Sequence, residues 1–275
     1  MAFAGNSVLC RLALGPELID ASSFTAIRLL SGVIVLWLLV SLQRGVRADK
    51  QVKPSWWPAV LLFAYAACFS FAYINLQTGT GALVLFAAVQ FTIISYSLWR
   101  GQRLVLMEWL GLIVACTGFV MLMLPSATSP SPMGLFLMTI AGMAWGGYTL
   151  LGRQSKAPLM DTYGNFLRSV PFAALLLICF LSSTQLQISG IVLAVLSGGL
   201  ASGVGYAIWY QALTGLTAVQ AAVVQLLVPV IATLGGVIFA QEHVSAKFLL
   251  CSGLILGGIF VVIAAKTKLP SSSKT

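Results

Sequence analysis

The sequence predicts an all-α integral membrane protein of about ten transmembrane helices in two inverted five-helix repeats. Of its 275 residues, 59% are hydrophobic and only 8% are charged, and the mean hydropathy is +1.00. A soluble domain carries about 25% charged residues, so this chain cannot cover itself with polar surface. The apolar residues form long runs, which favours helices over the alternating strands of a membrane barrel.

A nine-residue segment that occurs twice predicts the repeats. Residues 145–153 (WGGYTLLGR) echo residues 3–11 (FAGNSVLCR) at an offset of 142. Further matches follow in the same order at offsets of 139 to 141: Asp20 with Asp161, Arg28 with Arg168, residues 101–103 with 240–242, and Gly118 with Gly258. This order predicts an internal duplication, and duplicated membrane modules commonly build a transport path between the two copies.

Ten apolar runs are the candidate spans, since a transmembrane helix needs about 20 apolar residues. Gly, Pro and polar residues separate them. They cover residues 1–14, 20–43, 56–76, 79–99, 104–124, 132–152, 162–182, 188–211, 217–239 and 246–265. The predicted division is a first repeat over 1–125, a Ser- and Pro-rich linker over 126–132, a second repeat over 133–265 and a disordered cytoplasmic tail over 266–275.

The first span is short for a transmembrane helix. Fourteen residues rise about 21 Å, against a hydrocarbon core of about 30 Å. Its counterpart carries 13 residues before Trp145, whereas two residues precede Phe3, a difference of 11. We therefore expect this helix to be truncated and the natural start to lie upstream of Met1. The alternative is a genuinely short half-helix.

The basic residues predict the orientation. Eleven of the 15 follow even-numbered spans: Arg44, Arg47, Lys50, Lys53, Arg100, Arg103, Arg153, Lys156, Lys266, Lys268 and Lys274. The positive-inside rule then places both termini in the cytoplasm, and five spans per half give the halves opposite orientations. Because the charge lies in short loops, the expected partner is the lipid bilayer and not a nucleic acid.

The sequence lacks the residues of an enzyme or a metal site. It has one histidine, His243, and five cysteines at wide spacing, without a CxxC, GxSxG, HExxH or phosphate-loop motif. We therefore expect no catalytic residue, metal or cofactor. The six acidic residues lie in loops or near helix ends, which argues against a cationic drug substrate and against simple proton antiport.

Polar and aromatic residues inside the spans are the candidate substrate-binding residues, because polar groups are costly in lipid and point inward. They are Asn6, Tyr73, Asn75, Gln90, Trp145, Tyr148, Trp209 and Gln225. Aromatic faces combined with amide groups suit a neutral or zwitterionic metabolite. The alternative is hydrogen bonding between helices for the amides, and anchoring at the membrane interface for the Tyr and Trp residues.

Arg28, Arg168 and Pro229 are candidates for gating or structural roles. The two arginines lie about two turns into spans two and seven. Their long stems can reach the headgroups, they can fix two gates, or they can contact an anion. Pro229 removes a backbone hydrogen bond within span nine, which permits bending, although membrane helices tolerate proline widely.

Residues 222–242 carry the pattern AxxxxLxPVxxxxxGxxxxxE. With the paired modules and the FAGNSVLCR segment, this pattern resembles the drug/metabolite transporter superfamily, specifically its EamA-type ten-helix exporters. The first module departs from the pattern, with Gln102 where the second has Glu242 and Val89 where the second has Pro229.

The resemblance implies a multi-pass exporter of the bacterial inner membrane that works by alternating access. The implied substrate is a small neutral or zwitterionic, amino-acid-like metabolite, and the aromatic amino acid exporters are the nearest branch. The alternative function is a non-transporting membrane subunit or a component of a lipid-carrier flippase. The sequence leaves a homodimer open as the oligomeric state.

Overall fold

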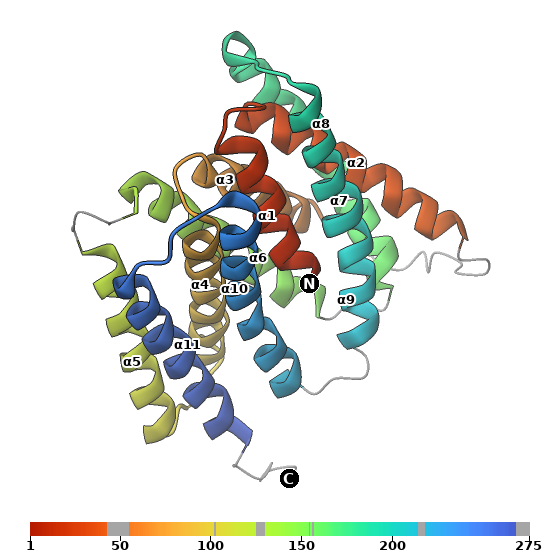
Figure 1. Ribbon diagram of the computed structural model, residues 1–275. Coiled ribbons are helices and arrows are strands. Elements are labelled where there is room, and N and C mark those ends of the chain that lie inside the picture. Colours follow the sequence, from red (N-terminus) through yellow and green to blue (C-terminus); the bar gives the residue numbers. More distant parts are fainter. Residues whose placement is uncertain are drawn as a thin grey trace.

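The structure, a computed structural model, describes residues 1–42, 55–101, 103–124, 130–153, 155, 157–213 and 218–267, and their regular elements are helices (Figure 1). Nine of the spans are single helices: α1 (Ala2–Leu14), α2 (Ala21–Leu42), α3 (Trp57–Tyr73), α4 (Thr78–Trp99), α5 (Leu106–Met123), α6 (Pro132–Gly152), α7 (Pro158–Cys179), α10 (Ala218–Ala240) and α11 (Ala246–Thr267). The remaining span is built from α8 (Ile188–Val195), η2 (Leu196–Val204) and α9 (Gly205–Leu213).

Length and composition support membrane spans. Within the described part of the chain, six helical segments are long and apolar enough to cross a bilayer, and four shorter apolar helices accompany them. The predicted class, an all-α membrane protein of about ten helices, is confirmed.

The predicted ends of the helices differ from those in the structure by up to four residues. α7 begins at Pro158, four residues before the predicted start, because proline suits the first turn of a helix. It ends at Cys179, and residues 181–183 form a separate 3₁₀ helix, η1. α11 continues to Thr267, two residues into the predicted tail, and residues 268–275 lie outside the described part, as does most of the predicted linker.

The eighth span contains an interruption that the sequence analysis did not predict. Residues Leu196–Val204 are π-helical, a rare conformation that often occurs at functional sites. Here η2 packs closely against α2, since a Cβ built on Gly198 would lie 2.0 Å from the carbonyl oxygen of Arg28 and 2.0 Å from Ser31 Oγ. Glycine at 198 is therefore a requirement of this contact.

Helix packing follows one pattern in both halves. α6 packs against α3 and α4, and α1 packs in the corresponding way against α8–η2 and α10. Equivalent helices also meet directly: α2 with α7, α4 with α10, and α5 with α11. Exchanging the first five spans for the last five thus maps these contacts onto one another, which is the arrangement that inverted repeats produce. The duplication itself stays a prediction.

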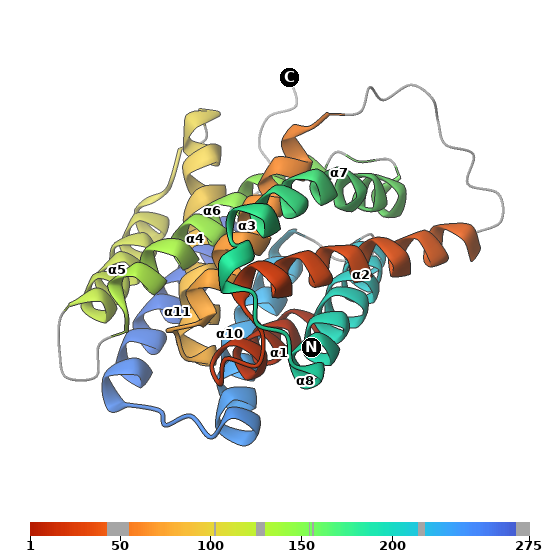
Figure 2. The same cartoon turned by 90° about the horizontal axis from the view of Figure 1, so that it is seen from above.

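The α5–α11 pair lies side by side in both views (Figures 1 and 2). Gly111 and Gly258 face each other in this pair: a Cβ on Gly111 would lie 2.6 Å from the Gly258 carbonyl oxygen, and a Cβ on Gly258 would lie 2.5 Å from that of Gly111. Small residues let membrane helices approach this closely.

Candidate functional site

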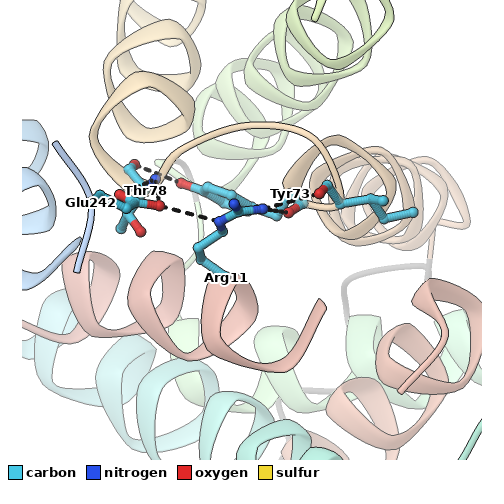
Figure 3. Close-up of polar contacts among 5 residues, drawn as sticks. Arg11, Tyr73, Thr78 and Glu242 are labelled. Carbon is cyan, nitrogen blue, oxygen red and sulfur yellow. Dashed lines mark hydrogen bonds and ion pairs between the residues drawn. The ribbon is translucent and has the colours of Figure 1, made fainter. Parts of the chain in front are cut away.

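An ion pair between Arg11 and Glu242 joins the two halves at one end of the bundle (Figure 3). The distance from Arg11 Nε to Glu242 Oε1 is 3.2 Å. Glu242 follows α10 after Gln241, which turns the chain with φ at 52°. Its two carboxylate oxygens also accept hydrogen bonds from the backbone N–H of Thr78, at 2.9 and 2.8 Å. This N–H belongs to the first turn of α4, where unpaired donors and the helix dipole favour a negative charge.

Arg11 connects the same carboxylate to the end of α3. Its Nη1 donates to the carbonyl oxygens of Tyr73 and Ile74, at 3.1 and 3.0 Å, and the Tyr73 hydroxyl donates to the Thr78 carbonyl at 3.2 Å. These contacts join the end of α1, the α3–α4 turn and the α10–α11 loop. We call Arg11, Tyr73, Ile74, Thr78 and Glu242 the Arg11–Glu242 clamp.

Asp20 makes a second tie at this end. One carboxylate oxygen accepts from the Ser22 hydroxyl and from the backbone N–H of Ser23, and the other accepts from the backbone N–H of Gln185 at 3.0 Å. Partial burial alone would raise the pKa of Asp20, but these hydrogen bonds stabilise the charged form and hold the pKa below its usual value. The carboxylate is therefore ionised at neutral pH, where it links the α1–α2 turn to the segment between α7 and α8.

A hollow of about 300 Å³ opens beside this tie. Its wall includes Glu17, Asp20, Phe71, Phe180 and Gln185. The hollow, the Asp20 tie and the clamp lie where odd-numbered spans end, opposite the predicted basic loops.

Aromatic rings from both halves meet in the interior around Trp145. Its ring centroid lies 4.9 Å from that of Tyr65, 5.0 Å from Tyr206, 5.4 Å from Tyr148 and 5.8 Å from Phe3. Tyr65, Trp145, Tyr148 and Tyr206 are buried. We call these four residues and Phe3 the central cluster. Their rings come from α1, α3, α6 and α9 and pack against Trp145.

Polar side chains surround the central cluster. Asn6 Nδ2 donates to the Tyr65 hydroxyl at 3.2 Å, and Asn6 Oδ1 accepts from the Ser197 hydroxyl of η2. On the other side, Asn165 Nδ2 donates to the Tyr148 hydroxyl at 3.4 Å, and Arg168 Nη1 donates to Asn165 Oδ1 at 3.4 Å.

Arg28 lies against the same cluster and is only 1% exposed. Its Nη2 donates to the Tyr65 hydroxyl at 2.9 Å and its Nε to Ser202 Oγ at 3.4 Å. Its Cζ lies 5.1 Å from the centroid of the Tyr65 ring and 4.9 Å from that of Phe69. Among the described residues no carboxylate pairs with Arg28, and its Nη1 has no hydrogen-bond partner.

The structure brings together Asn6, Trp145 and Tyr148 from the predicted substrate-binding set, with Trp209 beside them through Phe3 (ring centroids 5.7 Å apart). Gln90 and Gln225 are buried in α4 and α10, which pack against each other.

The remaining predicted residues lie elsewhere or play other structural parts. Tyr73 belongs to the Arg11–Glu242 clamp, and Asn75 is exposed in the turn after α3. Of the gating or structural candidates, Arg28 and Arg168 both contact residues around the central cluster, and Pro229 is buried within α10.

Sequence reasoning missed Tyr65, Ser197, Ser202 and the ion pair of Glu242. One signal could have identified Tyr65: it precedes Tyr206 by 141 residues, which matches the repeat offset. The two serines lie in the unpredicted π-helix, and an ion pair across 231 residues leaves no local pattern.

The described residues thus form a multi-pass, all-α membrane protein with a buried centre of aromatic, amide and guanidinium groups. Residues 132–264 match the EamA-like transporter family. The chain is 48% identical to a Pseudomonas aeruginosa protein named uncharacterized protein PA1977, over 97% of this chain and 92% of that protein. It is 30% identical to the uncharacterized transporter YwfM of Bacillus subtilis, over 93% and 88% of the two chains.

An uncharacterized transporter of Archaeoglobus fulgidus is 27% identical over 72% of each chain. A solved crystal structure superposes with a TM-score of 0.64 over 97% of this chain and 96% of that one, at 21% identity, and so shares the fold. The chain belongs to the EamA-like transporter family, within the drug/metabolite transporter superfamily.

Proposed function

We propose that this transporter exports small neutral or zwitterionic, amino-acid-like metabolites from the bacterial cytoplasm by alternating access. In this proposal it lies in the inner membrane with both termini cytoplasmic. The observation that carries it is the central cluster, in which apolar ring faces lie beside the amide of Asn6 and the guanidinium of Arg28. Sites for small metabolites combine mostly apolar walls with a few polar groups in this way.

The two ends of the bundle support alternating access. The Arg11–Glu242 clamp and the Asp20 tie both connect first-half segments to second-half segments, at the end that the positive-inside rule places outside the cytoplasm. A substrate that leaves the cell must pass this end, so both ties must break when the path opens outward. Symmetric contacts between the halves allow one module to rock against the other.

Close packing of the central rings is the observation that favours the alternative, a non-transporting subunit or a component of a lipid-carrier flippase. In the transport scheme, this close packing belongs to an occluded state. The rings then separate when the substrate enters. Measuring the uptake and efflux of a metabolite panel in reconstituted vesicles distinguishes metabolite export from this alternative function. Saturable flux of an amino-acid-like compound supports transport, and no saturable flux of any compound by fully inserted protein rejects it.

Gln90→Ala and Tyr148→Ala test the candidate site within the transporter. We expect each to weaken the apparent affinity for the transported compound by about three- to tenfold, because one polar contact contributes about 1 kcal/mol. Expression should not change. Concentration-dependent flux in vesicles is the measurement, with Gln187→Ala, an exposed glutamine at the start of α8, as the matched control. Kinetics identical to those of the control would clear both residues of a role.

A further inference from the structure

We propose that Arg28 and Tyr206 form a subsite for the carboxylate of the transported metabolite. This inference rests on the proposed function and narrows its substrate class, from neutral or zwitterionic compounds to those that carry a carboxylate.

Arg28 carries a buried charge that no carboxylate of the described residues pairs with. Burying a guanidinium is costly unless it is paired with an anion and fully hydrogen-bonded. Arg28 has two hydroxyl partners and two aromatic faces, but no described carboxylate pairs with it, and Nη1 is left without a partner. A fixed buried donor of this kind matches one oxygen of a bound carboxylate.

Tyr206, in the second half of the chain, provides a second buried donor. Its side chain is 2% exposed and its hydroxyl has no hydrogen-bond partner. It borders the same group of rings as Arg28: Arg28 Nη2 donates to the Tyr65 hydroxyl at 2.9 Å, and Tyr65 and Tyr206 both pack against Trp145. A carboxylate offers two oxygens, so one anion can accept from Arg28 Nη1 and from the Tyr206 hydroxyl together.

The surroundings define the rest of the ligand. The ring centroids of Tyr65 and Tyr206 lie 4.9 and 5.0 Å from that of Trp145. Such faces accept an apolar side chain, and they also attract an ammonium group through their quadrupole. A compound with a cationic group and no carboxylate would meet the charge of Arg28 without compensation.

Thermal unfolding of the purified full-length protein in detergent tests the subsite with matched acid and amide probes. The pairs are L-leucine with L-leucinamide, L-phenylalanine with L-phenylalaninamide, and 3-phenylpropanoate with 3-phenylpropanamide. The last pair lacks the amino group and so isolates the carboxylate. We expect at least one acid to raise the midpoint of unfolding, and its amide to need about a tenfold higher concentration for the same shift.

Two variants assign that difference to the subsite. Arg28→Gln should abolish the preference for the acid, and Tyr206→Phe should weaken acid binding by about tenfold. The second variant removes only a hydroxyl that has no partner, so it remains informative even if Arg28→Gln does not fold. Arg100→Gln, at an exposed arginine after α4, is the control and should keep the acid preference of the unmodified protein.

Equal shifts with acid and amide, no shift with any acid, or an acid preference that survives Tyr206→Phe unchanged would overturn the subsite. Flux assays with the same probes separate this failure from that of the proposed function. Saturable flux of amides as well as acids would reject the proposed subsite and support the proposed transport function. Acid binding that requires Tyr206, without any flux, would support the proposed subsite and reject the proposed export function.

Discussion

Gly198→Ala should destabilise the protein by about 3 kcal/mol or more, the upper range for forcing extra atoms into a packed interior. The added Cβ would lie 2.0 Å from the carbonyl oxygen of Arg28, a backbone atom that moves only if α2 and η2 separate. We expect the purified variant to unfold at a much lower temperature or to be recovered mainly as aggregate. Thermal unfolding and size-exclusion profiles in detergent are the measurements.

Gly199→Ala is the control for this variant. It makes the same substitution one residue later, where the new Cβ would lie 3.1 Å from a methyl group of Val35 that can shift. Both substitutions replace a glycine of a helical segment, so each gains about 1 kcal/mol in helix propensity. This gain cancels when the two variants are compared. Equal unfolding temperatures of the two variants would contradict the close contact of η2 with α2 at Gly198.

Glu242→Lys should open the end of the bundle that the Arg11–Glu242 clamp closes. The substitution places a cation beside Arg11 and removes the acceptor of the Thr78 N–H. A coupling of 1–3 kcal/mol changes a conformational equilibrium by about 5–150-fold, so we expect at least a fivefold shift toward the outward-open form. Cys10, which is buried beside Arg11 in α1, is the reporter in a chain whose other four cysteines are replaced by alanine.

The measurement is the rate at which a membrane-impermeant maleimide labels Cys10 from outside. We expect this rate to rise about fivefold or more in Glu242→Lys. Glu17→Lys makes the same charge change at an exposed position of the same end and should leave the rate unchanged. Glu242→Gln keeps an acceptor for Thr78 and should give an intermediate rate. Equal labelling in all variants would show that the ion pair does not hold this end closed.

The number and place of the spans followed from the sequence because the lipid environment acts on every residue of a helix. A run of about 20 apolar residues is stable in a bilayer as a spanning helix, and the described residues form ten apolar helical segments where ten spans were predicted, although four of them are shorter than a full span. The π-helix at Leu196–Val204 could not be predicted, because it depends on how closely η2 approaches α2.

The candidate site was predictable only in part. Asn6 and Tyr148 were recognised because polar groups at depth are expensive in lipid, and the structure places both around Trp145. Glu242 was predicted as no more than an acid near a helix end. Its pairing with Arg11 depends on the relative position of two loops from different halves, which local sequence does not encode.

In the proposed transport cycle, the two halves separate at the end closed by the Arg11–Glu242 clamp. A disulfide between the halves tests it at Ile19 and Leu186, which form an isolated antiparallel bridge. Hydrogen bonds on either side (Asp20 N–H to Gln185 O at 3.1 Å, and Gln187 N–H to Leu18 O at 2.9 Å) make this a non-hydrogen-bonded pair. The Cα atoms of such a pair lie about 4.5 Å apart, within the range that a disulfide spans.

Flux should be measured for Ile19→Cys with Leu186→Cys, in a chain without its five native cysteines, before and after oxidation and again after reduction. The Ile19→Cys single variant controls for the oxidant. We expect the cross-linked protein to carry no saturable flux and reduction to restore it. Full flux through completely cross-linked protein would contradict the account, because substrate would then cross without separation of the two halves.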